Sequence, residues 1–260
     1  MVNPKVGLSM LYCLGKPFKK MTEQLLAVKT KYVEIVDDGF HTLNKRRVAV
    51  LKDIANSHGL EYTVHAPFAD INIASLSKPM LRAMLKRLEQ SIVHASALDS
   101  HVWVFHPGMK TGISSFYPNM DWLQNMETVK TLLQIAREND LKIAIENVPE
   151  PFPFLMKSVE DFARFYAGLG ENMGMVLDVG HANLNRQIES FLETFSNRIV
   201  HMHLSDNDGK HDQHLGIGHG TIDWDRVLGS IKKMPYGEII IVESVERVEE
   251  SVARIEQLLA

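Results

Sequence analysis

The sequence has one cysteine, no long apolar run and no excess of basic residues, and each shortage excludes a class of protein. Cys13 is the only cysteine in 260 residues, so no disulfide can form within the chain. No apolar stretch reaches the roughly 20 residues that a membrane-spanning helix needs, and the N-terminus shows no signal-type cleavage site. We therefore expect a cytoplasmic protein without a membrane partner.

The charge balance does not predict a nucleic-acid-binding surface. The formal net charge is -4 and the isoelectric point is about 6.3, whereas such surfaces are dominated by clustered lysine and arginine. With 45% apolar and 23% charged residues, the chain can bury one large core, and its length fits an α/β barrel of about 250 residues. We expect one domain over residues 1–260.

Short apolar runs alternate with amphipathic segments along the whole chain, which predicts repeated strand–helix units. The expected strands are Lys5 to Ser9, Tyr32 to Val36, Tyr62 to His65, His101 to His106, Ile143 to Glu146, Met173 to Asp178, Ile199 to His203 and Ile239 to Glu243. The expected helices are Phe18 to Lys31, Asn44 to Ser57, Lys78 to Leu98, Asp121 to Asn139, Ser158 to Leu169, Ile188 to Phe195, Asp225 to Lys233 and Glu246 to Leu259.

Strict alternation of strands and helices implies a parallel sheet, and eight units imply closure into a (β/α)8 TIM barrel. An open doubly wound sheet is the alternative fold. It would normally carry a Gly-Xaa-Gly-Xaa-Xaa-Gly fingerprint after its first strand, and no such pattern follows Ser9.

Two helix N-caps are also expected. One is Asp121, and the other is Ser158, with Asp161 completing a capping box.

Histidines and carboxylates, the residue types that commonly bind metals, occur where the expected strands end. The active sites of TIM barrels lie at the C-terminal ends of the strands. The apolar run ending at His203 passes directly into a polar loop rich in aspartate and histidine. The residues at strand ends are His65, His106, Glu146, Asp178, His203 and Glu243, and His181, Asp212 and His214 lie in loops just beyond. Their convergence, not any single residue, predicts a metal site.

Carboxylates gathered at one barrel mouth would repel one another, and a divalent cation relieves that repulsion. Mixed imidazole and carboxylate ligands suit manganese, zinc, cobalt or iron better than calcium, and magnesium also remains a candidate cofactor. Residue types alone do not choose among these ions. His201 is not expected to bind the metal and is expected at most to contact a ligand.

Several phrases resemble the xylose isomerase-like barrel superfamily, which contains sugar isomerases and epimerases and also the endonuclease IV enzymes. The resemblance spans nearly the whole chain. The phrases are His65-Ala-Pro-Phe, Asp70-Ile-Asn-Ile-Ala-Ser, His106-Pro-Gly, Ile145-Glu-Asn, Leu177-Asp-Val-Gly-His, His203-Leu-Ser-Asp-Asn-Asp and Gly216-Ile-Gly-His-Gly-Thr-Ile-Asp-Trp.

The ketose epimerase pattern of this superfamily implies one metal ion on Glu146, Asp178, His203 and Glu243. In that pattern the two glutamates are also the acid–base pair, acting through a metal-stabilised enediolate on a small-molecule sugar or polyol. Hydride shift is the alternative route. The resemblance further implies a homo-oligomer. For the sugar reaction we also expect substrate contacts from His65, His106, Asn147, His181 and Asp206.

The endonuclease IV pattern falls on the same four residues together with His65, His106, His181, Asp212 and His214, and implies up to three zinc ions. Under that alternative the partner is abasic-site DNA. It requires phosphate-binding cations at the rim, for which Lys110, Lys157, Arg186 and Lys210 are the candidates. The segment around Asp178 lacks the cysteine flanks typical of endonuclease IV, which favours the sugar enzyme. A non-catalytic barrel that binds metal or carbohydrate is a third possibility.

Two segments are expected to shape the pocket. Phe116 and Trp122 lie in or near the long loop after the fourth strand, and such loops often form lids. Pro149 to Leu155 contains three prolines, which preclude a regular helix. We expect this segment to form an ordered rim or a substrate wall.

Overall fold

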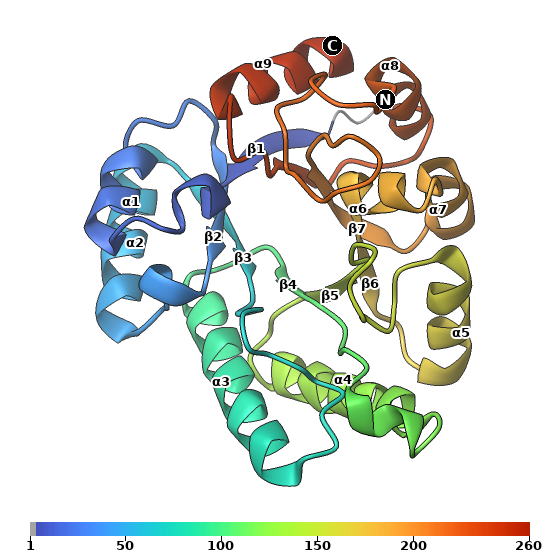
Figure 1. Cartoon of the computed structure of the whole chain (residues 1–260). Helices are drawn as coiled ribbons and strands as arrows, with labels where there is room; N and C mark the ends of the chain where they lie inside the picture. Colours follow the sequence, from blue (N-terminus) through green and yellow to red (C-terminus); the bar gives the residue numbers. More distant parts are fainter. Residues whose placement is uncertain (1–3) are drawn as a thin grey trace.

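The computed structural model describes residues 4–260 and has eight parallel strands that close into a barrel, each paired with its neighbours in sequence. Figure 1 shows this ring of strands inside a ring of helices. The strands are β1 (Lys5–Ser9), β2 (Tyr32–Val36), β3 (Glu61–His65), β4 (Trp103–Phe105), β5 (Ile143–Glu146), β6 (Gly174–Asp178), β7 (Ile199–Leu204) and β8 (Ile239–Val242). The pairing of β1 with β8 closes the barrel and confirms the predicted TIM-barrel fold.

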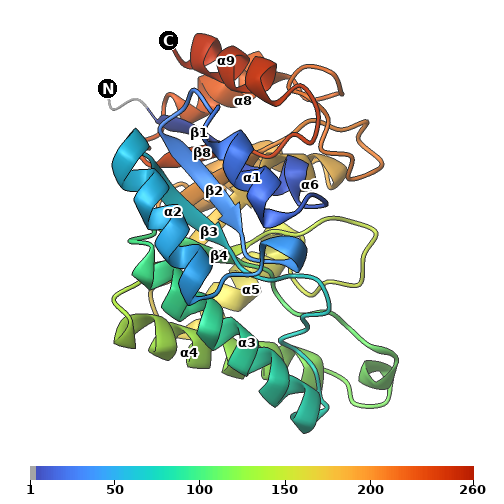
Figure 2. The same ribbon diagram turned by 90° about the vertical axis from the view of Figure 1, so that its left-hand side faces the viewer.

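The helices that cover the strands are α1 (Phe18–Leu25), α2 (Lys45–His58), α3 (Lys78–Ala97), α4 (Met120–Glu138), α5 (Val159–Leu169), α6 (Val179–Leu184), α7 (Ile188–Phe195), α8 (Trp224–Ile231) and α9 (Val248–Leu259). Short 3-10 turns follow β1, β2 and β4: η1 (Met10–Cys13), η2 (Gly39–His41) and η3 (Gly112–Ser115). In Figure 2 the longer connections project from one side of the barrel. Among residues 4–260, no helix combines the length and apolar character needed to cross a bilayer.

Side-chain alternation along β4 separates two cores. Trp103 faces the helices, where its indole Nε1 donates a hydrogen bond to Ser91 of α3 at 3.0 Å. Val102 and Val104 face the barrel axis and pack with Ala144 and Val176 in a small interior cluster. The larger core lies between strands and helices. Side chains that continue the inward faces therefore emerge at the barrel mouth.

Side-chain caps explain where some of the helices begin and one error in prediction. Ser158 caps α5 with Asp161 in the expected capping box. Asp121 is not a cap, because α4 begins one residue earlier, after Asn119, and the Asp121 carboxylate accepts a hydrogen bond from its neighbour's main chain. The unpredicted α6 begins at the end of β6, where Asp178 accepts a hydrogen bond from the His181 main-chain N–H at 2.6 Å.

Candidate metal centre

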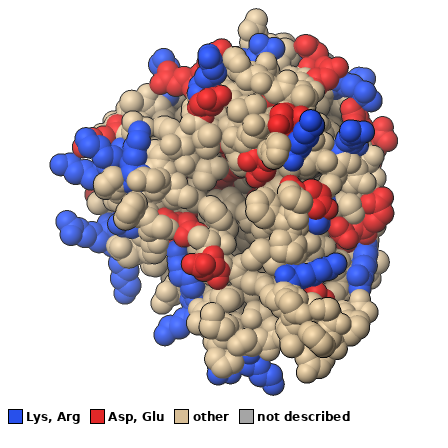
Figure 3. Space-filling view, viewed as in Figure 1, with Lys and Arg blue, Asp and Glu red and all other residues tan. Residues whose placement is uncertain are grey.

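All six residues predicted at strand ends lie at one mouth of the barrel. His65, Glu146 and Asp178 are the last residues of β3, β5 and β6, and His203 is the penultimate residue of β7. His106 and Glu243 directly follow β4 and β8. Because all eight strands are parallel, these side chains meet in one place. Figure 3 shows a hollow near the centre of the molecular face, with acidic side chains around it.

Four of these residues form a compact buried group with potential metal-binding atoms within 4.8 Å of one another: Glu146, Asp178, His203 and Glu243. Their exposed fractions are 4% or less. The Nδ1 atom of His203 lies 3.2 Å from Glu146 Oε1 and 3.5 Å from Glu243 Oε2. Three carboxylates and one imidazole in this arrangement can surround a single cation.

Two further groups flank the four-residue group. His65 and His106 place their Nε2 atoms 3.4 Å and 3.3 Å from Glu146 Oε2, so Glu146 is shared with the first group. On the other side, His181 and His214 place their Nε2 atoms 3.4 Å from the two carboxylate oxygens of Asp212. The nine residues named from the sequence thus form three adjoining clusters.

Main-chain hydrogen bonds orient three of the histidines. The Nδ1–H groups of His65, His181 and His214 face the carbonyl oxygens of Ala66, Asn147 and Glu243 at 2.8, 2.8 and 3.1 Å. Donation from Nδ1 fixes the tautomer and leaves the Nε2 lone pair directed at the cavity. Metal-binding histidines commonly have this arrangement.

The distances between histidine Nε2 atoms and carboxylate oxygens are those expected for ligands of a shared divalent cation, and they are longer than charge-assisted hydrogen bonds. Charge-assisted N–H···O contacts are typically about 2.7–2.9 Å, whereas the Nε2–carboxylate distances here are 3.3–3.4 Å. Ligand atoms about 2.0–2.2 Å from a tetrahedral ion are roughly 3.3–3.6 Å apart. One buried oxygen of each of Glu146, Asp178 and Asp212 also lacks a hydrogen-bond partner within residues 4–260.

The electrostatics also favour added positive charge. Burial would lower the pKa of His65, His181 and His214, but the surrounding carboxylates overcome it and raise these pKa values to about 9, 10 and 9. Burial raises the pKa of Glu243 to about 7. Burial also acts to raise the pKa of Glu146, yet His203 and the neighbouring imidazoles hold it well below its ordinary value. The cluster attracts cations, either protons or a metal ion.

A cavity of about 570 Å³ opens above the four-residue group. Glu146 and Glu243 line it together with His65, His106, His181, Asp212 and His214. The remaining lining is apolar: Leu11, Leu14, Val36, Phe68, Pro149, Phe152, Phe154 and Val245. Pro149, Phe152 and Phe154 belong to the proline-rich segment, which therefore forms a wall of this cavity. No lysine or arginine of residues 4–260 lines it.

Two expected pocket residues lie elsewhere. Phe116 is 77% exposed, and Trp122 is buried beneath Arg164, whose guanidinium lies 4.0 Å from the indole ring centre. Trp122 lines a different cavity, of about 470 Å³, together with Lys110 and Arg164. The expectation that Phe116 and Trp122 cover the pocket is therefore wrong, since neither lines the cavity above the four-residue group. The start of the loop after β4 is instead hydrogen-bonded to the proline-rich segment, from Lys110 N to Pro153 O and from Leu155 N to Gly108 O.

Asp206 and Asn147, expected to contact a substrate, use their side chains inside the fold. Asp206 is fully buried and accepts hydrogen bonds from Gly218 N, Ile222 N and Trp224 Nε1 at 2.9, 3.3 and 2.8 Å. Both polar ends of the Asn147 side chain bind the main chain of Asp178, at 2.8 and 2.9 Å. Asp206 thus stabilises the loop after β7, and Asn147 holds Asp178 in place.

Glu34 is a residue of this site that was not predicted from the sequence. Its carboxylate is fully buried in the barrel, next to the four-residue group, and lies within 3.3 Å of the Nε2 atoms of both His201 and His203. These three residues form a fourth group of potential ligands. The available signal was a glutamate within the apolar run Tyr-Val-Glu-Ile-Val of β2, facing the barrel axis while Val33 and Ile35 face the helices.

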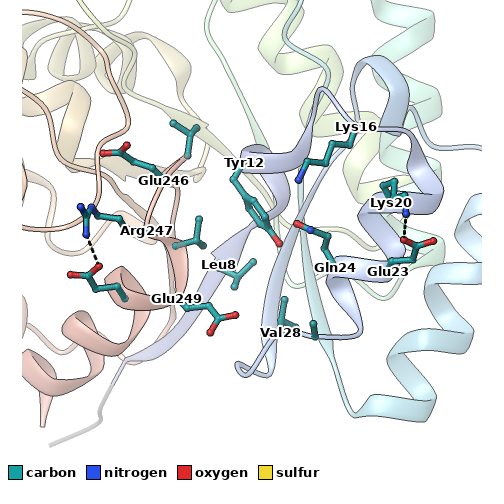
Figure 4. A pocket seen from close by; sticks show the side chains of 14 residues that line it. Leu8, Tyr12, Lys16, Lys20, Glu23, Gln24, Val28, Glu246, Arg247 and Glu249 are labelled. Atoms are coloured by element: carbon teal, nitrogen blue, oxygen red, sulfur yellow. Dashed lines mark hydrogen bonds and ion pairs between the residues drawn. The ribbon is translucent and has the colours of Figure 1, made fainter.

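The candidate rim cations do not reach the cavity. Lys157 pairs with Glu150 at 2.6 Å, and Lys110 and Arg186 line other depressions. Lys210 is likewise absent from the lining. A larger groove, of about 880 Å³, separates α1 from the segment before α9 and contains Tyr12, Lys16 and Gln24 (Figure 4). None of the nine clustered residues lines that groove.

A parallel barrel with potential metal ligands at its C-terminal mouth defines the class of protein. Residues 24–259 match the model of the xylose isomerase-like TIM barrel family, and the chain belongs to that family. It is 30% identical to the uncharacterized protein MJ1311 of Methanocaldococcus jannaschii, over 94% of this chain and 84% of that protein.

Two further comparisons are with proteins whose names refer to an activity. A solved D-tagatose 3-epimerase-like protein superposes with a TM-score of 0.90 and 29% identity, over 98% of this chain and 95% of the other. A "Probable endonuclease 4" of Lachnoclostridium phytofermentans is 25% identical over 67% of this chain and 62% of its own length. The chain therefore resembles both branches expected from its motifs, and it resembles the epimerase-like protein over more of its length.

Proposed function

We propose that this protein is a divalent-metal-dependent isomerase or epimerase that acts on an unphosphorylated sugar. The observation that carries the proposal is the placement of Glu146 and Glu243. Both belong to the four-residue ligand group, and both line the cavity above it. Asp178 and His203 complete the group but do not line the cavity. The same site can thus bind a cation and present two carboxylates to a substrate.

A divalent cation on Glu146, Asp178, His203 and Glu243 would supply Lewis acidity that polarises a sugar carbonyl and acidifies the adjacent C–H bond. Glu146 and Glu243 are placed to exchange the proton of that bond, one carboxylate removing it and the other returning one. Without a cation the two carboxylates already differ, since Glu146 is held ionised while burial raises the pKa of Glu243 to about 7. Unequal environments are typical of an acid–base pair, and a bound cation would lower both pKa values. His181 would orient a substrate oxygen.

The cavity lining supports a neutral substrate. Phosphate groups are usually bound by arginine, lysine or main-chain N–H groups at helix N-termini, and the lining contains neither of those side chains in the described chain. A free ketohexose is therefore expected to have a kcat/KM about 10–100-fold above that of its phosphate ester, because a phosphate that loses hydration without gaining a cationic partner costs about 1–3 kcal/mol or more. Parallel steady-state assays of the two compounds test this. Preference for the ester would contradict the assignment.

Solvent-exchange experiments test the proposed reaction. Ketoses and polyols would be incubated in D2O with the protein and Mn²⁺, Co²⁺, Mg²⁺ or Zn²⁺, and followed by NMR. Deuterium at the carbon beside the carbonyl is the expected result, since the proton removed by a carboxylate exchanges with solvent. Product without deuterium would indicate hydride shift. Binding of sugar and metal without any conversion would contradict the enzymatic proposal and favour the carbohydrate-binding barrel.

A second candidate, a zinc phosphodiesterase acting on abasic-site DNA, is favoured by one observation. The groups around His65 and His106 and around Asp212 flank the four-residue group and could hold two more ions. Clustered ions can activate water and stabilise both oxygens of an in-line phosphoryl displacement. Within residues 4–260, no lysine or arginine lines the cavity, and this opposes the candidate because a DNA phosphate would need such partners. Cleavage of an abasic-site duplex with zinc, without ketose conversion, would establish it.

A further inference from the structure

Glu34 is a charged side chain in the barrel interior that the proposed proton transfer does not use. It projects from β2 and is 0% exposed. Three donors converge on its Oε2 atom: Thr63 Oγ1 at 3.1 Å, His201 Nε2 at 3.2 Å and His203 Nε2 at 3.3 Å. A buried carboxylate with this many donors is held in one orientation.

The contact with His203 determines which imidazole nitrogen faces the metal centre. An ionised carboxylate can only accept, so the hydrogen must be on Nε2 of His203. Nδ1 faces Glu146 and Glu243, 3.2 and 3.5 Å away, and would offer its lone pair to a cation held by the four-residue group. The opposite tautomer would set a lone pair against the Glu34 carboxylate and turn an N–H toward the cation.

We propose that Glu34 is the positioning residue of the metal centre, acting through His203 to fix its tautomer and to strengthen its Nδ1 as a ligand. This role rests on the proposed metal site. His65, His181 and His214 instead donate Nδ1–H to neutral main-chain carbonyls. A carboxylate withdraws the proton more strongly than a carbonyl does, so His203 becomes the more electron-rich ligand. Thr63 and His201 hold Glu34 in the required position.

The direct test is metal affinity of the full chain carrying Glu34→Gln. Glutamine has nearly the same shape and its amide oxygen can still accept hydrogen bonds, but it has no charge. Replacing a partner that orients a metal-bound histidine typically costs 10–100-fold in affinity. We expect that loss for Co²⁺ and Mn²⁺ in equilibrium dialysis, with a changed visible spectrum of the Co²⁺ complex. The thermal unfolding midpoint of metal-free protein should stay close to that of the wild type.

Asp121→Asn is the matched control, since Asp121 is also a buried carboxylate but lies on α4, outside the metal centre. It should bind both ions like the wild type. Thr63→Val removes one donor from Glu34 and should weaken binding less than Glu34→Gln does. The metal affinity of this variant tests the same role if the Glu34 variant folds poorly.

A double-mutant cycle with His203→Ala separates positioning from a general charge effect. If Glu34 acts through His203, Glu34→Gln should cause no further loss of affinity once the imidazole is gone. An undiminished loss in that background would overturn the positioning role, as would wild-type affinity of the single variant. Absence of metal binding by the wild type would instead overturn the proposed metal site and this role with it.

Discussion

Replacing Glu243 with glutamine is expected to lower kcat by about 10²–10⁴-fold, the usual contribution of a general acid or base. The amide keeps the shape of the buried side chain but can neither accept nor deliver a proton at neutral pH. Glu243 is placed for this role because it lines the cavity and belongs to the four-residue group that would hold the cation beside the substrate. The measurement is kcat on the sugar that exchanges deuterium, at saturating metal.

Glu246→Gln is the control for that loss. Glu246 is exposed, lies three residues further along the same connection, and lines the separate groove beside α1. Its replacement should leave kcat unchanged. If Glu243→Gln bound metal and retained wild-type kcat, Glu243 would have no part in proton transfer, and the assignment of Glu146 and Glu243 as a pair would be wrong.

Asp206→Ala is expected to lower the free energy of unfolding by about 3 kcal/mol or more. The carboxylate accepts hydrogen bonds from Asn207 N, Gly218 N, Ile222 N and Trp224 Nε1. Truncation would leave these donors without their partner inside the fold, and each such loss costs about 1–3 kcal/mol without full additivity. Guanidinium chloride unfolding of the metal-free protein measures the change.

The exposed Asp225 offers a comparison on the neighbouring helix α8. Asp225→Ala should change stability by no more than about 0.5 kcal/mol, as surface substitutions usually do. Equal stabilities of the Asp206 and Asp225 variants would contradict the structural role of Asp206. The same loop carries Asp212 and His214, so the Asp206 variant is also expected to bind metal less tightly.

Much of the barrel follows from local sequence pattern. Strands such as Tyr32–Val36 and Ile143–Glu146 have the predicted bounds, because short apolar runs between polar segments mark them well. Helix α6 was not predicted, since the six residues Val179–Leu184 are too few to show helical periodicity. The start of α4 was misplaced because Asn119, with φ 67°, ends the preceding loop and leaves Asp121 inside the helix.

The ligand residues were predictable because parallel strands bring their C-terminal ends together. Sequence position says less about what a side chain contacts. Asp206 follows the His203 strand like a substrate-binding residue, yet its oxygens face the returning loop at Gly218 and Ile222. Glu34 lies near the middle of β2, and its proximity to His201 depends on strands far apart in sequence. Such contacts appear only once the barrel is closed.

Metal content per chain tests the central claim most directly. Wild-type protein and the Asp178→Ala variant, purified without chelator or metal-binding tag and reconstituted identically, would be measured by mass spectrometry. The account predicts about one equivalent of a divalent ion in the wild type and a marked loss in the variant, because Asp178 is one of the four clustered ligands. Two to three equivalents of zinc would favour the phosphodiesterase. No bound metal after reconstitution would contradict both functions.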